Sequence, residues 1–87
     1  MKTVWKFTLP PSDIATIPMP TGAELLSVAE QGGAVRLWAR VDDDQPETQR
    51  RIRIAGTGHP DAGGEFVGTV VLLGGSLVFH VFDLGEE

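Results

Sequence analysis

The stretch Ala34-Val35-Arg36-Leu37-Trp38-Ala39-Arg40-Val41 alternates between small or apolar residues and bulky or charged ones. A period of two is typical of a β-strand with one face buried, because successive side chains point to opposite sides. One face carries the residues predicted to lie in the core, which are Val35, Leu37, Ala39 and Val41. The other face carries Arg36, Trp38 and Arg40.

The same alternation appears near the start of the chain. Apolar and polar residues alternate over Lys2 to Leu9, which predicts a second half-buried strand that ends at Pro10-Pro11. Ile14 to Met19 is predicted to form a short strand, and Pro18 restricts it to the edge of a sheet because proline donates no backbone hydrogen bond.

Glycine pairs mark two of the connections. Glu24 to Glu30 reaches Ala34 to Val41 through Gln31-Gly32-Gly33, which predicts a β-hairpin. The alternative is a helix over Ala23 to Gln31, since alanine, glutamate and leucine favour one. Phe66 to Leu73 and Ser76 to Phe82, joined by a second glycine pair, predict another hairpin.

A further hairpin is predicted between these two. Asp42 to Gln49 is acidic and contains a proline, as expected for a solvated loop, and Arg50 to Ala55 then alternates again. We therefore expect Arg50 to Ala55 to pair with Ala34 to Val41. Together the patterns predict an all-β protein, a small antiparallel sandwich or barrel of about seven short strands built from hairpins.

Composition limits the class of protein. The 87 residues suffice for a single β domain over residues 1–87. The absence of cysteine excludes disulfides and thiolate metal sites, and no apolar segment resembles a signal peptide or a membrane span. A net charge of −5 argues against binding bulk nucleic acid. We expect a cytoplasmic protein without cofactors or metals.

The last predicted hairpin is apolar on both faces, so a small domain has little with which to cover its second face. We expect a homo-oligomer whose interface contains Val70, Leu72, Val78, His80 and Phe82. The alternative is a closed barrel in which the first strand or a loop covers that face. His80 has apolar neighbours and is interpreted as a core or interface histidine with satisfied hydrogen bonds.

All five arginines lie between Arg36 and Arg53. If the two arginine-bearing strands pair, one face combines five residues that suit a phosphate with a stacked base: Arg36, Trp38, Arg40, Arg51 and Arg53. The simpler interpretation is that Asp42-Asp43-Asp44 and Glu47 neutralise the arginines and that the face is only solvated.

The glycine-rich segment Gly56 to Gly64 is the remaining candidate, and we expect Thr57, Gly58 and His59 to contribute to the ligand site. It lacks the Gly-Lys-Ser/Thr end and the helix of phosphate-binding loops. It is interpreted either as a connection with glycines at positive φ or as a nest for an anion. His59 could carry a proton, but no nucleophile or metal-ligand spacing accompanies it.

Several segments resemble a family of small bacteriophage-encoded proteins described only as a domain of unknown function. The resemblance rests on the segments Lys2 to Phe7, Met19 to Val28, Leu37-Trp38-Ala39, Gly56 to Pro60, Gly68-Thr69-Val70 and Leu77 to Phe82. It implies a phage origin and a location in the host bacterial cytoplasm, and it brings no activity that could be assigned to residues.

The functional expectation is therefore a small, non-enzymatic phage protein that acts by binding. We expect it to counteract host defence, either by sequestering a phosphorylated or nucleotide ligand or by blocking a host protein. The alternative is a structural or accessory phage protein that docks into a larger assembly through its apolar C-terminal hairpin. An enzyme ranks third, because only His59 offers acid–base chemistry.

Overall fold

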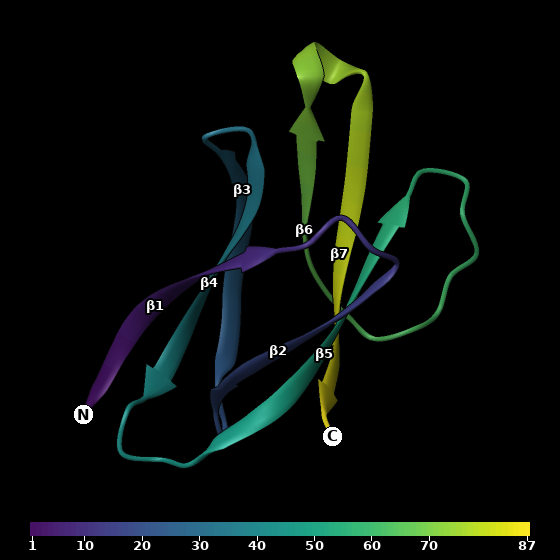
Figure 1. Ribbon diagram of the computed structural model, residues 1–87. Helices are drawn as coiled ribbons and strands as arrows, with labels where there is room; N and C mark the ends of the chain where they lie inside the picture. The colour runs from purple at the N-terminus through teal and green to yellow at the C-terminus, as the bar shows by residue number, and fades with distance from the viewer.

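The computed structural model describes all residues from 1 to 87 and contains two antiparallel sheets. The three-stranded sheet, sheet A, has the order β1-β4-β3, and the four-stranded sheet, sheet B, has the order β2-β5-β7-β6 (Figure 1). The strands are β1 (Lys2–Leu9), β2 (Ile14–Pro20), β3 (Glu24–Gln31), β4 (Ala34–Asp42), β5 (Glu47–Gly56), β6 (Glu65–Leu72) and β7 (Leu77–Glu86).

The architecture confirms the predicted all-β fold, with its seven strands in two sheets. The decisive stretch is β4, the central strand of sheet A, and its four predicted core residues are all buried. Ala23 to Gln31 forms no helix, because residues 24–31 pair with β4 as strand β3. Strand β2 lies at the edge of sheet B, as Pro18 requires.

Two predicted hairpins are present and one is wrong. β3 and β4 are joined through Gly32 and Gly33, which have φ values of +63° and +81° that favour glycine. β6 and β7 are joined through the short 3-10 turn Leu73–Gly75. β4 and β5 do not pair, because the acidic segment between them carries the chain from sheet A to sheet B.

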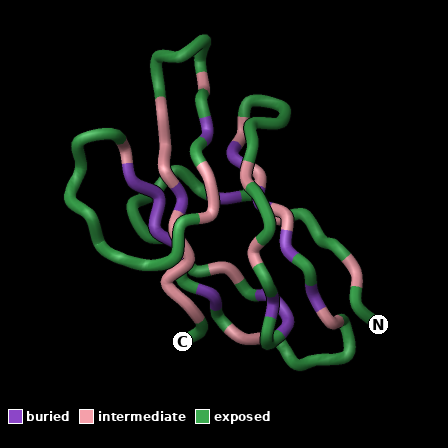
Figure 2. Tube along the Cα trace, turned by 180° about the vertical axis from the view of Figure 1, so that it is seen from behind, coloured by how far each residue is buried: buried purple, intermediate pink, exposed green.

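The core lies between the inward faces of the two sheets, and Figure 2 shows the buried segments gathered there while the hairpin tips and the long loop are exposed. On one flank β3 packs closely on β6, where Val28 lies against Gly68. The opposite flank, between β1 and β2, is more open and leaves Trp5 40% exposed. The sandwich is thus closed more tightly on one side than on the other.

A buried ion pair lies on the inward face near one end of sheet B. Arg50 donates from Nε and Nη2 to the two carboxylate oxygens of Asp83, at 2.9 and 2.6 Å, and the Gly85 amide donates to the same carboxylate at 2.8 Å. Burial alone would raise the pKa of Asp83, but these hydrogen bonds and the charge of Arg50 together hold that pKa below its ordinary value. The pair links β5 to β7.

The fold includes no helix with the length and apolarity that crossing a membrane as a helix requires.

Candidate functional site

The outer face of sheet A carries a group of cations around an indole. Directly opposed residues on paired strands share a face, and the register places Lys6 opposite Trp38 and Thr8 opposite Arg36. We call the set on this surface the Trp38 face; its members are Lys2, Lys6, Arg36, Trp38 and Arg40. It thus holds four of the seven Lys and Arg side chains of a chain whose net charge is −5.

Three of these four cations, Lys2, Lys6 and Arg36, form no ion pair with a carboxylate. Lys6 donates to the side-chain oxygen of Gln31 at 2.8 Å. Arg36 donates to the Thr8 hydroxyl and, at 3.2 Å, to the carbonyl of Gln31. Arg40 alone is paired, with Glu24 at 3.2 Å, and both of these side chains are more than half exposed. The positive charges of Lys6 and Arg36 therefore remain open to an external anion.

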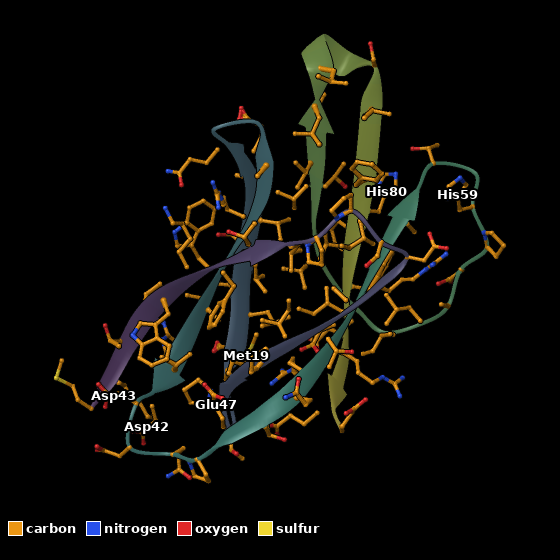
Figure 3. The ribbon with its side chains drawn as sticks, in the orientation of Figure 1. Met19, Asp42, Asp43, Glu47, His59 and His80 are labelled. Carbon is orange, nitrogen blue, oxygen red and sulfur yellow. The ribbon has the colours of Figure 1, made fainter.

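The acidic segment forms no ion pair with the arginines of this face, although Asp42 lies opposite Lys2 in the register. Asp42, Asp43 and Asp44 instead accept hydrogen bonds from the Met1 amine, at 3.3, 2.8 and 2.7 Å. The hydrogen bonds to Asp43 and Asp44 raise the pKa of that amine to about 11. Glu47 forms no ion pair, and it lies with Asp42 and Asp43 at the end of the molecule far from His59 (Figure 3).

Arg51 and Arg53 do not join the Trp38 face, because β5 belongs to sheet B and their side chains lie on its outer face. Arg51 is exposed and unpaired, whereas Arg53 is only 8% exposed. Arg53 donates to the carbonyls of Asp13 and Pro60, at 3.4 and 3.1 Å, and its buried Nε has no partner. The predicted five-residue site is thus split between opposite faces of the sandwich.

The glycine-rich segment forms a third, separate location. It is a long loop from β5 to β6 that passes β7, and Gly58, Gly63 and Gly64 have positive φ values as expected for glycines in a connection. Thr57 is tied to β7 by a 2.8 Å hydrogen bond to His80. The other ring nitrogen of His80 bonds to Thr69 at 3.0 Å, so this histidine is satisfied as predicted.

His59 lies on this loop, on the same side of the molecule as His80 (Figure 3), and borders an apolar cavity together with Ser12 and Asp13. Serine, aspartate and histidine are the side chains of a hydrolytic triad, but a triad requires hydrogen bonds that link them. Here the Ser12 hydroxyl donates to the carbonyl of Ile14, and the ring of His59 bonds to neither partner. The arrangement does not activate a nucleophile.

The predicted oligomer interface mixes two faces of the last hairpin. Val70 is 2% exposed and belongs to the core, and Leu72 packs against the same core. The register pairs Val70 with Phe79 and Val71 with Val78, so Val78, His80 and Phe82 point to the outer face with Phe66 and Val71. Three of the five predicted residues therefore lie on the outer surface of the hairpin, whereas Val70 and Leu72 face the core.

Sequence reasoning missed the contribution of β1 to the Trp38 face. The alternation of β1 already separated Lys6 from the apolar side of the strand, but only the pairing of β1 with β4 brings that lysine opposite Trp38. The sequence of β1 therefore indicated on which face of its strand Lys6 lies, but not which strand pairs with β1.

The fold and these surfaces define a small two-sheet β-sandwich domain with a cationic, indole-centred outer face. The chain belongs to the family described as "Domain of unknown function (DUF7352)", whose sequence model matches residues 1–87. No curated protein and no solved structure matches the chain.

Proposed function

We propose that this protein acts by binding, without catalysing a reaction, and that the Trp38 face captures a phosphorylated small molecule or nucleotide. One observation carries the proposal: Lys6 and Arg36 flank Trp38 on one surface, and neither is neutralised by a carboxylate. The chain has a net charge of −5, so these two unpaired cations beside an indole form a local positive surface on an acidic protein.

The chemistry of the three side chains fits this ligand class. Lysine offers a point charge and arginine a planar fork to phosphate oxygens, and charge-assisted hydrogen bonds of this kind are stronger than neutral ones. A base stacked on an aromatic side chain contributes about 1–3 kcal/mol. The open β-sheet surface places no wall around the ligand, so we expect affinity to depend on stacking and charge together.

The resemblance to bacteriophage proteins gives the proposal its biological setting. We infer that the chain is phage-encoded and works in the cytoplasm of the infected bacterium. There, capture of a nucleotide or the blocking of a host protein through the same cationic face would counteract host defence.

A thermal-shift screen with nucleotides and cyclic oligonucleotides tests the proposal. A ligand that binds only the native state stabilises it by about 2.7 kcal/mol when present at 100 times its Kd. We expect Trp38→Leu and Lys6→Gln to lose the shift, and the matched variants Trp5→Leu and Arg51→Gln, on other surfaces, to keep it. No shift with any compound, or an equal loss in both pairs, would contradict the proposal.

A second candidate function rests on the outer face of the last hairpin. Phe66 and Val71 are 59% and 54% exposed, and the ring of Phe66 contacts that of Phe82 at a tilt of 60°, with ring centroids 5.6 Å apart. An apolar surface of this kind favours self-association or docking into a larger phage assembly. Sedimentation as an oligomer that Val71→Lys dissociates, or recovery of the chain from purified virions, would support this function; a monomer absent from virions would exclude it.

A further inference from the structure

A cavity of about 380 Å³ opens at the end of the sandwich where the hairpin tips lie. Its walls come from both sheets, with Leu9 and Val35 on one side and Ile54, Leu72 and Phe79 on the other. The segment Pro10-Pro11 also borders it, where the chain passes from β1 to β2. The Trp38 face lies on the outer surface of sheet A, so this cavity is a separate feature.

The walls of the cavity are held in place. The Ile54 amide donates to the carbonyl of Asp13 at 2.9 Å, which fixes the end of the Pro10-Pro11 connection on β5. Arg53 donates to the same carbonyl and to that of Pro60, so one buried side chain links this connection to the glycine-rich loop. The rings of Pro10 and Pro11 also restrict the backbone of this connection.

Small residues border the cavity; they are Gly33, Ala34 and Gly56. At Gly56 a β-carbon would lie 3.0 Å from Cε1 of His59. The glycine thus allows the imidazole to lie against the backbone at the border of the cavity.

The ring of His59 has unused hydrogen-bonding capacity at this border. The Thr8 hydroxyl accepts from Arg36, and the Ser12 hydroxyl donates to Ile14. The Asp13 carboxylate is 81% exposed and lies 3.8 Å from Arg53. Neither ring nitrogen of His59 has a partner within the chain, and an imidazole offers at least one N–H donor in either protonation state.

We propose that this cavity binds a small molecule that has an apolar body and a hydrogen-bond-accepting head group, with the head group placed at His59. Small-molecule sites are concave and mostly apolar, have a few polar groups that fix orientation, and enclose about 300–1,000 Å³. The cavity lies at the lower end of this range, so it suits a compound of one to three fused or linked rings or a short acyl chain.

Two fluorescent probes that share one apolar body test the site. 1-Anilinonaphthalene-8-sulfonate carries an acceptor head group, and N-phenyl-1-naphthylamine lacks it. We expect each probe to bind the folded protein with one probe per chain. His59→Ala should weaken the sulfonate about tenfold, a change of about 1.4 kcal/mol, and leave the amine within about twofold.

A matched pair of substitutions on β6 locates the binding. Leu72→Trp fills the cavity and should weaken both probes by roughly tenfold or more, whereas Val71→Trp, on the exposed outer face, should change them by less than about twofold. Leu72→Phe is a milder filler that serves if the tryptophan prevents folding, and near-ultraviolet circular dichroism verifies native packing in each variant.

Three outcomes would overturn the proposal. The first is equal binding by the Leu72 and Val71 variants, because the probe would then sit elsewhere. The second is sulfonate affinity that is unaffected by His59→Ala. The third is failure of both probes to bind the folded protein, whatever its oligomeric state. None of these outcomes depends on the Trp38 face.

Discussion

The side chain of Val28 occupies the space that a side chain at Gly68 would need. Its Cγ2 atom lies 2.9 Å from the position of a β-carbon on Gly68, closer than such atoms normally approach. The two residues belong to β3 and β6, edge strands of different sheets that share no ladder of hydrogen bonds. Side-chain packing at this point is therefore what closes this flank of the sandwich.

We predict that Gly68→Ala destabilises the protein, because the added methyl group must displace Val28. Overpacking of this kind costs about 1–3 kcal/mol of unfolding free energy. Urea unfolding measures the loss. The double variant with Val28→Ala should recover most of it, and losses that simply add would show that the two residues do not meet.

The second prediction concerns the buried pair of Arg50 and Asp83. Asp83→Asn leaves the guanidinium of Arg50 buried without its counter-charge, so we expect a loss of about 3 kcal/mol in urea unfolding at neutral pH. Glu24→Gln breaks the exposed pair with Arg40 and is the matched control, with an expected loss below about 1 kcal/mol. Equal losses in the two variants would contradict the prediction that the buried pair contributes more to stability than the exposed one.

The Asp83 carboxylate also makes the free energy of unfolding depend on pH in the acid range. Its pKa is lowered in the folded state, so the stabilisation is present above the unfolded value of 3.8 and is lost as pH falls through the lower folded value. The Asp83→Asn variant should therefore lose less stability than the parent between pH 4 and pH 2. Parallel acid profiles for the two proteins would contradict this assignment.

The third prediction concerns the Met1 amine, whose pKa of about 11 lies above its ordinary value of 8.0. A raised pKa means that the stabilisation is complete below pH 8 and is lost as pH rises toward 11. We expect acylation of this amine at pH 8 to be slower in the folded protein than in urea. The effect should shrink in 1 M salt, because the group is exposed, and most of it should be lost in the double variant Asp43→Asn, Asp44→Asn, in which only Asp42 still accepts from the amine.

The fourth prediction compares two neighbouring arginines. Arg53→Met removes the hydrogen bonds that hold Asp13 and Pro60, so amides of the loop Thr57 to Gly64 should exchange roughly tenfold faster with solvent. Arg51 lies two residues before Arg53 on the same strand but is exposed and unpaired, so Arg51→Met should leave the exchange of these amides unchanged. Equal exchange in both variants would show that Arg53 does not tether the loop.

Much of the fold could be predicted because the alternation of apolar and polar residues identifies individual strands and their buried faces. The period-two pattern of residues 34–41 identified both the core side and the polar side of β4, and glycine pairs located two hairpins. What alternation does not contain is which strands pair. The acidic segment after Val41 is long enough either to form a hairpin loop or to cross between sheets, and its composition suits both.

The errors in the candidate site follow from that gap. Arg51 and Arg53 were placed with Trp38 because β4 and β5 were expected to pair, whereas Lys6 was overlooked because β1 was not placed beside β4. Arg53 also looked exposed by its place in the alternation. Arg53 is held by the carbonyl of Pro60, seven residues further along the chain, and the glycine-rich loop around Pro60 has no apolar pattern from which this contact with the sheet could be predicted.

The two ends of the chain are fastened at the same end of the sandwich. Met1 is held by three aspartates at the end of β4 and just after it, and the amide of Glu87 donates to the carbonyl of Gln49 at 2.9 Å, whereas the hairpin tips point the other way (Figure 1). A tether attached to either terminus would therefore orient the domain with its open end facing outward. Copies immobilised in this way would all present the opening beside His59 to the solution.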